Sequence, residues 1–131
     1  MRDLQEPLQD FLKYRQQYLS GNPNRLSPAQ IVNLRLKMST LLSELGDHIP
    51  NTRRCLSEAK NAQINEYIQL RKESCTQKDA EMQSKYNTAQ ALIDAEYQFN
   101  RLKQVIDGGR EILNALSSKL RVMELEAKNI T

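Results

Sequence analysis

Basic side chains recur at helical spacing through the middle of the chain. On one helix turning ~100° per residue, five cations and one tyrosine share an arc of about 40°. These residues are Arg53, Lys60, Tyr67, Arg71, Lys78 and Lys85. Arg54 and Lys72 lie beside the arc, and the acids of this segment lie roughly opposite. Cations neutralise phosphates and an aromatic ring offers a stacking face for a base, so the pattern predicts a surface for single-stranded nucleic acid.

The same pattern has a second interpretation. Lys and Arg beside an apolar seam often lay their stems over it and keep their charges in water. The apolar residues Ile64, Ile68 and Met82 border the arc. In favour of a binding role, Arg71 and Lys78 fall close to core positions of the seam, where cations destabilise a coiled coil. The arc also requires a helix that continues through residues 74–79, and both interpretations stay open.

No arrangement of side chains predicts catalysis. The one histidine, His48, lies between Gly46 and Pro50 and is expected to be a loop or capping residue. Cys55 and Cys75 have neither the spacing of a zinc site nor that of a redox motif, so free thiols in a reducing compartment are expected. The Gly108-Gly109 pair lacks the Lys-Ser/Thr of a phosphate-binding loop. We expect no catalytic residue, no metal ligand and no cofactor.

Composition indicates helices. Hydrophobic residues make up 39% of the chain but aromatics only 5%, without Trp, so Leu, Ile, Ala and Met must fill any core. The formal net charge of +3 permits an anionic partner without requiring one. The sequence has no apolar run of ~18 residues and no secretory signal, so no membrane partner is expected. The expected location is the cytoplasm, or the host cytoplasm if a phage encodes the chain.

The first half contains two marked helices. Apolar residues from Leu4 to Leu19 recur at helical spacing, and Gly21 is predicted to end this helix as a left-handed C-cap. Residues 20–24 form a loop on composition. Ser27, Pro28 and Gln30 then predict a capping box that starts a second helix. Its seam consists of Ile31, Leu34, Met38, Leu41 and Leu45, widened by Leu42, and it breaks between Gly46 and Pro50.

A third helical stretch is predicted from about Asn51. Ser74, Thr76 and Asp79 could mark a turn or a new N-cap, so a hairpin near residues 74–79 is favoured over a continuous helix. The last third carries the clearest seam, with apolar or small residues alternating at three and four. They are Leu92, Ala95, Phe99, Leu102, Ile106, Gly109, Leu113, Leu116, Leu120, Met123 and Ala127.

The register of that seam passes through Gly108-Gly109. A helix break there would have no reason to preserve the register, so one long helix is predicted, closely packed at Gly109. The alternative is two helices that part at the glycines. The seam exceeds what the second helix can cover, which predicts self-association, although folding back on the third stretch could cover part of it. The residues assigned to oligomerisation are Leu92, Phe99, Leu102, Ile106, Gly109, Leu113, Leu116, Leu120 and Met123.

The last helix resembles that of a known family. Residues 92–120, with Tyr97, Leu102, Val105-Ile106-Asp107-Gly108-Gly109 and Leu116, resemble the C-terminal helix of the UvsY-type recombination mediators of tailed phages. The likeness covers about residues 30–125. It implies a small, ring-forming helical protein that binds single-stranded DNA and helps to load a RecA-like recombinase. This chain lacks the aromatic-rich helix ends of that family.

The sequence therefore predicts an all-α, elongated helical hairpin or coiled-coil-like bundle that forms oligomers. Residues 1–26 are expected to form an N-terminal helix and loop, and residues 27–131 the hairpin and oligomerisation region, within a single domain. The expected function is non-enzymatic: binding of single-stranded DNA and assistance to a recombinase. The alternative is a protein-binding scaffold, adaptor or inhibitor that has no contact with nucleic acid.

Overall fold

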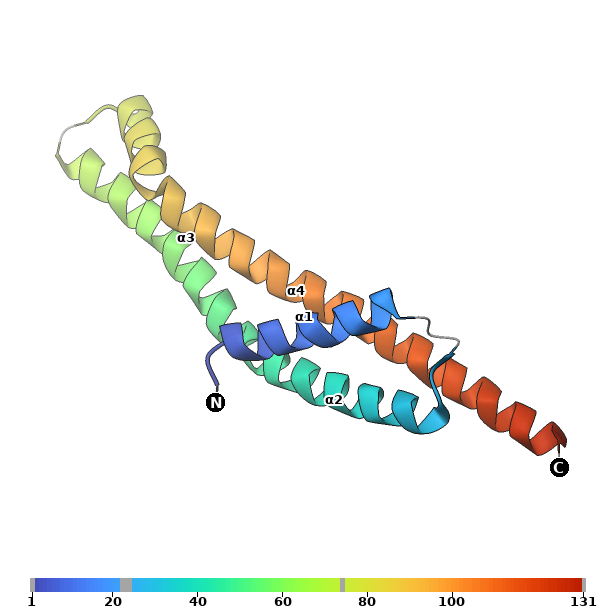
Figure 1. Ribbon diagram of the computed structural model, residues 1–131. Coiled ribbons are helices and arrows are strands. Elements are labelled where there is room, and N and C mark those ends of the chain that lie inside the picture. The colour runs from blue at the N-terminus through green and yellow to red at the C-terminus, as the bar shows by residue number, and fades with distance from the viewer. Residues whose placement is uncertain (1, 22–24, 74, 131) are drawn as a thin grey trace. The chain divides into compact units, whose positions relative to one another are not determined.

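The described part of the chain is entirely helical and loop. The computed structural model describes residues 2–21, 25–73 and 75–130. Within these ranges it contains four helices and no strand (Figure 1): α1 (Gln5–Ser20), α2 (Pro28–Asp47), α3 (Ile49–Lys72) and α4 (Gln77–Ile130). The predicted all-α class is confirmed.

Contacts divide the chain into two units. One contains Met1–His48 together with Gln104–Thr131, and the other contains Ile49–Lys103. α4 therefore contributes its second part to the first unit and its first part to the second. Within the first unit, α1 packs along α2.

The starts and ends of α1 and α2 follow from local chemistry. The predicted capping box is confirmed: the Ser27 backbone N–H donates to Oε1 of Gln30 at 2.9 Å, and the Gln30 N–H donates to Oγ of Ser27 at 3.2 Å. α1 ends before Gly21, whose N–H donates to the carbonyl of Gln17 at 3.0 Å. The left-handed cap was a wrong prediction, because Gly21 has φ −78° and ψ 167° and leaves the helix in an extended conformation. The loop expected at residues 20–24 lies partly outside the described residues.

The core of the first unit collects side chains from α1, α2 and α4. α1 contributes Phe11, which is fully buried, and α2 contributes most of its predicted seam. From α4, Val105, Ile106 and Leu116 are buried. Burial of such side chains contributes roughly 1.5–3 kcal/mol each, which makes this three-helix contact the main stabilising element of the unit.

Gly109 lies at the point where the three helices meet. A Cβ built on it would lie 2.5 Å from Cζ of Phe11 and 2.7 Å from Cδ2 of Leu42. Gly108, one residue earlier, has nothing within 4 Å of its Cβ position. α4 runs unbroken through both glycines, so the predicted long helix with a close contact at Gly109 is confirmed.

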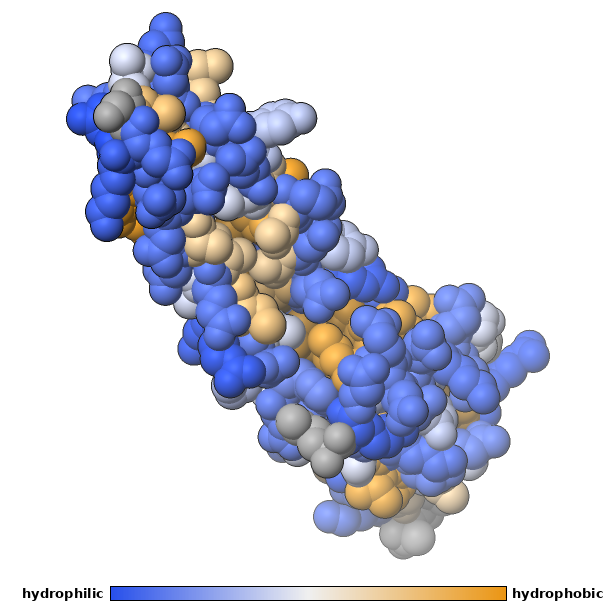
Figure 2. All heavy atoms as spheres, turned by 90° about the vertical axis from the view of Figure 1, so that its left-hand side faces the viewer, coloured by the Kyte–Doolittle hydropathy of each residue, from blue (hydrophilic) through white to orange (hydrophobic). Residues whose placement is uncertain are grey.

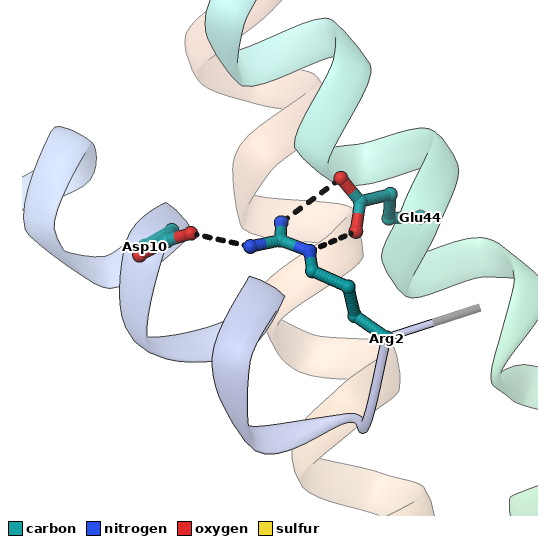
Figure 3. A network of polar contacts seen from close by, with 3 residues as sticks. All are labelled: Arg2, Asp10 and Glu44. Atoms are coloured by element: carbon teal, nitrogen blue, oxygen red, sulfur yellow. Dashed lines mark hydrogen bonds and ion pairs between the residues drawn. The ribbon is translucent and has the colours of Figure 1, made fainter.

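An ion-pair network joins the start of the chain to α1 and α2 (Figure 3). Nε and Nη2 of Arg2 donate to the two carboxylate oxygens of Glu44 at 2.9 Å each, and Nη1 donates to Oδ2 of Asp10 at 2.9 Å. The hydrogen bond to Glu44, followed by that to Asp10, raises the pKa of the Arg2 guanidinium. The bidentate contact with Glu44 and the bond to Asp10 hold the start of the chain against α1 and α2.

α3 and the first part of α4 form the second unit as an antiparallel hairpin (Figure 1). Asn87 Nδ2 donates to Oε1 of Glu66 at 2.8 Å, and the Arg53 guanidinium lies 5.9 Å from the ring centre of Phe99. The contact nearer the start of α3 thus lies farther along α4, as an antiparallel pair requires. The predicted hairpin near residues 74–79 is confirmed, although Ser74 itself lies outside the described residues.

The predicted new N-cap also forms. Thr76 Oγ1 accepts a hydrogen bond from the Asp79 N–H at 3.2 Å, and the Thr76 carbonyl accepts one from the Ala80 N–H at 2.9 Å. At the other break, a single residue, His48, separates α2 from α3, which begins at Ile49 with Pro50 in its first turn. Pro is tolerated there because the first turn of a helix needs no N–H donor.

Candidate nucleic-acid interface

The hairpin packs through a narrow face on each helix. On α3 the packing residues alternate at four and three and are all buried or half-buried; they are Thr52, Leu56, Ala59, Gln63, Glu66 and Leu70. On α4 they are mostly small, and they are Ala80, Ser84, Thr88, Leu92, Ala95 and Phe99. Small residues allow the two helices to approach closely, but they leave most of each helix surface exposed.

The prediction that one continuous helix carries all the cations of the arc is wrong. It required a continuous helix from Arg53 to Lys85, whereas α3 ends at Lys72 and α4 begins at Gln77. Lys78 and Lys85 therefore lie on the antiparallel partner of the helix that carries Arg53, Lys60 and Arg71. The N-cap at Thr76 starts a new helix, so the helical periodicity that placed Lys78 and Lys85 in line with Arg71 does not continue from α3 into α4.

The hairpin nevertheless brings these cations to one side. On α3, Arg53, Lys60, Tyr67 and Arg71 each follow directly after a packing residue, which places them ~100° from the packing face in the same direction. On α4, Lys85 follows the packing residue Ser84 in the same way, and Lys78 lies seven residues, or about two turns, before it. Because the helices run antiparallel, this direction is the same side of the hairpin for both. We call it the basic side.

A contact at the end of the hairpin away from its turn supports this geometry. Arg53 from α3 lies over the ring of Phe99, and Nζ of Lys103 lies 5.6 Å from the same ring centre. Lys103 follows directly after the buried Leu102, so it belongs to the basic side by the same rule. The predicted arc did not include Lys103, because it followed α3 and its continuation only as far as Lys85. Phe99, assigned to oligomerisation, is a ring that holds two cations.

Two of the predicted contact residues lie elsewhere. Arg54 and Lys72 each come two residues after a packing residue, ~200° away on the back of α3. Arg54 is also engaged locally, since it donates to Oδ1 of Asn51 at 2.7 Å and lies 3.8 Å from Glu58. Arg71 remains on the basic side, but its Nη1 donates to the carbonyl of Cys75 at 3.2 Å and so closes the end of α3.

Charges are unevenly distributed between the two sides of the hairpin. The basic side also carries Glu81 and Glu96, which are outnumbered by its cations. Glu58 and Asp94 each precede a packing residue and therefore lie on the other side, where Glu66 bonds to Asn87. Within the described ranges, no hydrogen bond or ion pair engages the ammonium groups of Lys60, Lys78 and Lys85, which are exposed.

The predicted oligomerisation seam is largely occupied by the chain itself. Leu102, Ile106, Gly109 and Leu116 are buried. The others are half-buried, and they are Leu92, Phe99, Leu113, Leu120 and Met123. The prediction considered the second helix and the third helical stretch as partners of this seam, but α1 covers it too, as the contact of Phe11 with Gly109 shows. The surplus that predicted self-association is therefore much smaller.

The residues considered for catalysis or metal binding stay apart. His48 is the C-cap of α2 and is buried, with its Nε2 lacking a hydrogen-bond partner among the described residues. Cys55 is exposed, Cys75 is half-buried, and neither forms a disulfide. Residues 2–21, 25–73 and 75–130 contain no group of three or more His, Cys, Asp or Glu side chains placed to hold a metal ion.

Hydropathy along the described helices gives no membrane-spanning segment, since none is both long and apolar enough to cross a bilayer. Comparison with known proteins adds no relative. The sequence matches no protein-family model, and no curated protein and no solved structure is significantly similar to it.

Proposed function

We propose that this chain is a non-enzymatic binding protein that holds single-stranded nucleic acid along the basic side of the α3–α4 hairpin. The observation that carries the proposal is the convergence of cations from two helices on one side. These cations are Arg53, Lys60, Arg71, Lys78, Lys85 and Lys103. The positions from Arg53 to Arg71 extend over ~27 Å at 1.5 Å per residue, enough to follow several nucleotides of an extended strand.

Tyr67 gives this side a stacking group. It is half-buried among the cations, in line with Lys60 and Arg71 on α3. A base stacked on an aromatic ring gains roughly 1–3 kcal/mol without regard to sequence, and cations nearby hold the backbone. The expected binding is therefore independent of sequence and strongly dependent on salt.

The test compares two charge reversals of equal size. Lys60→Glu with Lys78→Glu removes cations from the basic side, and Arg54→Glu with Lys72→Glu makes the same change on the back of α3. For binding to labelled oligothymidine, log K should fall with log salt with a slope of about −4 in the unaltered chain. The first pair should weaken binding by more than about tenfold and flatten the slope by about 1.5, whereas the second should have little effect.

Equal losses from the two pairs would show that net charge alone drives binding, and this would contradict the proposed side. A lack of retarded DNA at low salt would contradict nucleic-acid binding altogether. That result would favour the alternative role, a helical scaffold or adaptor for another protein, for which the exposed apolar residues of the hairpin are the supporting observation.

The likeness to UvsY-type mediators extends the proposal to the loading of a RecA-like recombinase. A mediator should shorten the lag of filament assembly on DNA covered by a single-strand-binding protein. An unchanged lag, with DNA binding intact, would leave a binding protein without the mediator role.

A further inference from the structure

Four large apolar side chains form an exposed row on α4 within the hairpin. Met82, Tyr86, Ile93 and Tyr97 expose 64%, 82%, 57% and 62% of their surface. On an ideal helix the four lie ~130–190° from the mean direction of the packing residues of α4, so the row runs along the side of the helix that faces away from α3. We call it the outer row. Figure 2 shows hydrophobic residues exposed among hydrophilic ones on one face of the molecule.

An exposed apolar residue on its own is ordinary, but a row at helical spacing is the pattern of a helix–helix contact. The spacings in the outer row are four, seven and four, which place the four side chains within an arc of ~60° on one face of the helix. The residues that the structure describes in α3 do not cover it, because α3 lies on the opposite side of α4. The row therefore offers a stripe to a further helix.

The spacings of the outer row are the same when counted from either end. Tyr86 and Ile93 lie at equal distances from the midpoint between Ala89 and Gln90, and so do Met82 and Tyr97. A surface that docks on its own copy about a two-fold axis requires this property, because residue i must meet residue j while j meets i. With the axis at this midpoint, two antiparallel copies pair Tyr86 with Ile93 and Met82 with Tyr97.

Two pairs of charges beside the row follow the same symmetry with opposite sign. In an antiparallel pair, residues on one flank of the row meet residues on the same flank of the other copy. Asp79 and Arg101, 10.5 and 11.5 residues from the midpoint, share one flank, and Lys85 and Glu96, 4.5 and 6.5 residues from it, share the other. Each of these two cations would therefore face an acid of the second copy, whereas Lys78 and Lys103, 11.5 and 13.5 residues from the midpoint on the flank of Lys85, would face each other. Among the described residues, none of the four side chains in the two opposite-charge pairs is engaged in an ion pair within its own chain.

From this pattern we infer that the outer row of α4 binds a second copy of the chain, antiparallel, about a two-fold axis between Ala89 and Gln90. The inference goes beyond the proposed nucleic-acid binding and does not depend on it. It also replaces the Leu92–Met123 seam as the self-association surface. A single helical stripe is small compared with the 1,200–2,000 Å² of stable complexes, so the expected dimer is weak, with a Kd of about 1–100 μM.

The first test follows the mass of the full chain, without nucleic acid, by sedimentation equilibrium from about 1 to about 300 μM, a range that brackets the expected Kd. The unaltered chain should pass from one copy to two. Ile93→Glu, which buries a charge beside Tyr86 of the second copy, should raise the Kd more than about tenfold. The control Ile64→Glu makes the same change at an exposed residue of α3 and should leave the Kd unchanged.

The second test fixes the partner and its direction. Lys85→Glu alone sets acid against acid, and Glu96→Lys alone sets cation against cation, so each variant should dimerise more weakly than the unaltered chain. An equimolar mixture of the two variants restores both pairs and should recover the dimer. A monomer at every concentration, a dimer unaffected by Ile93→Glu, or a mixture no tighter than its components would overturn the inference.

Discussion

Gly109 in α4 lies so close to Phe11 in α1 that a Cβ on the glycine would sit 2.5 Å from Cζ of the ring. The ring is fully buried. A long helix with a glycine at this one point thus allows α1 and α2 to approach α4. Replacing Gly109 by Ala should separate the three helices, while replacing Gly108 should not.

The Gly109→Ala variant should be less stable than Gly108→Ala by about 1–3 kcal/mol, the usual cost of overpacking a core. Both changes raise helix propensity by a similar amount, so their difference isolates the contact with Phe11 and Leu42. Urea unfolding followed by circular dichroism measures it. Equal stabilities would mean that Gly109 is not in close contact.

The capping box at the start of α2 gives a second prediction. Ser27→Ala removes the acceptor for the Gln30 N–H and should lower the free energy of unfolding by about 1 kcal/mol. Gln30→Ala removes the reciprocal bond, and the double variant should cost less than the sum because the two bonds support each other. Additive losses would argue against a reciprocal box. Ser27→Thr, which keeps the hydroxyl, is the control.

Phe99 should stabilise the hairpin through the cations above its ring. Phe99→Leu keeps an apolar side chain but removes the interaction with Arg53 and Lys103, and should cost about 1 kcal/mol in unfolding free energy. The loss should shrink when Arg53 is already replaced by Gln. The same loss in both backgrounds would mean that the ring contributes by packing alone.

His48 carries a buried ring nitrogen, Nε2, that lacks a hydrogen-bond partner among the described residues. A buried polar atom without a partner costs about 1–3 kcal/mol, so His48→Leu should raise the free energy of unfolding by about 1 kcal/mol. His48→Gln keeps a polar side chain and should be less stable than the Leu variant. A loss of stability in His48→Leu would show that the imidazole is needed at the junction of α2 and α3.

Much of the fold follows from local sequence. Ser27, Pro28 and Gln30 define the start of α2 because their hydrogen bonds close within one turn, and Thr76 does the same for α4. The unbroken register through Gly108-Gly109 correctly predicts one long helix, since phase is a property of the helix itself. Gly21 was misjudged because Gly permits a left-handed cap without requiring one.

The arrangement of the candidate sites was decided by tertiary structure. Periodicity along the chain placed Lys78 and Lys85 on a continuation of α3, and only the antiparallel return of α4 sets them on the side of the hairpin that carries Arg53 and Lys60. Periodicity also did not identify α1 as a partner of α4, because a single sequence does not show which apolar helix faces pack against each other. Residue spacing determines which side chains share a helix face, whereas the direction and pairing of the helices determine which faces share a surface.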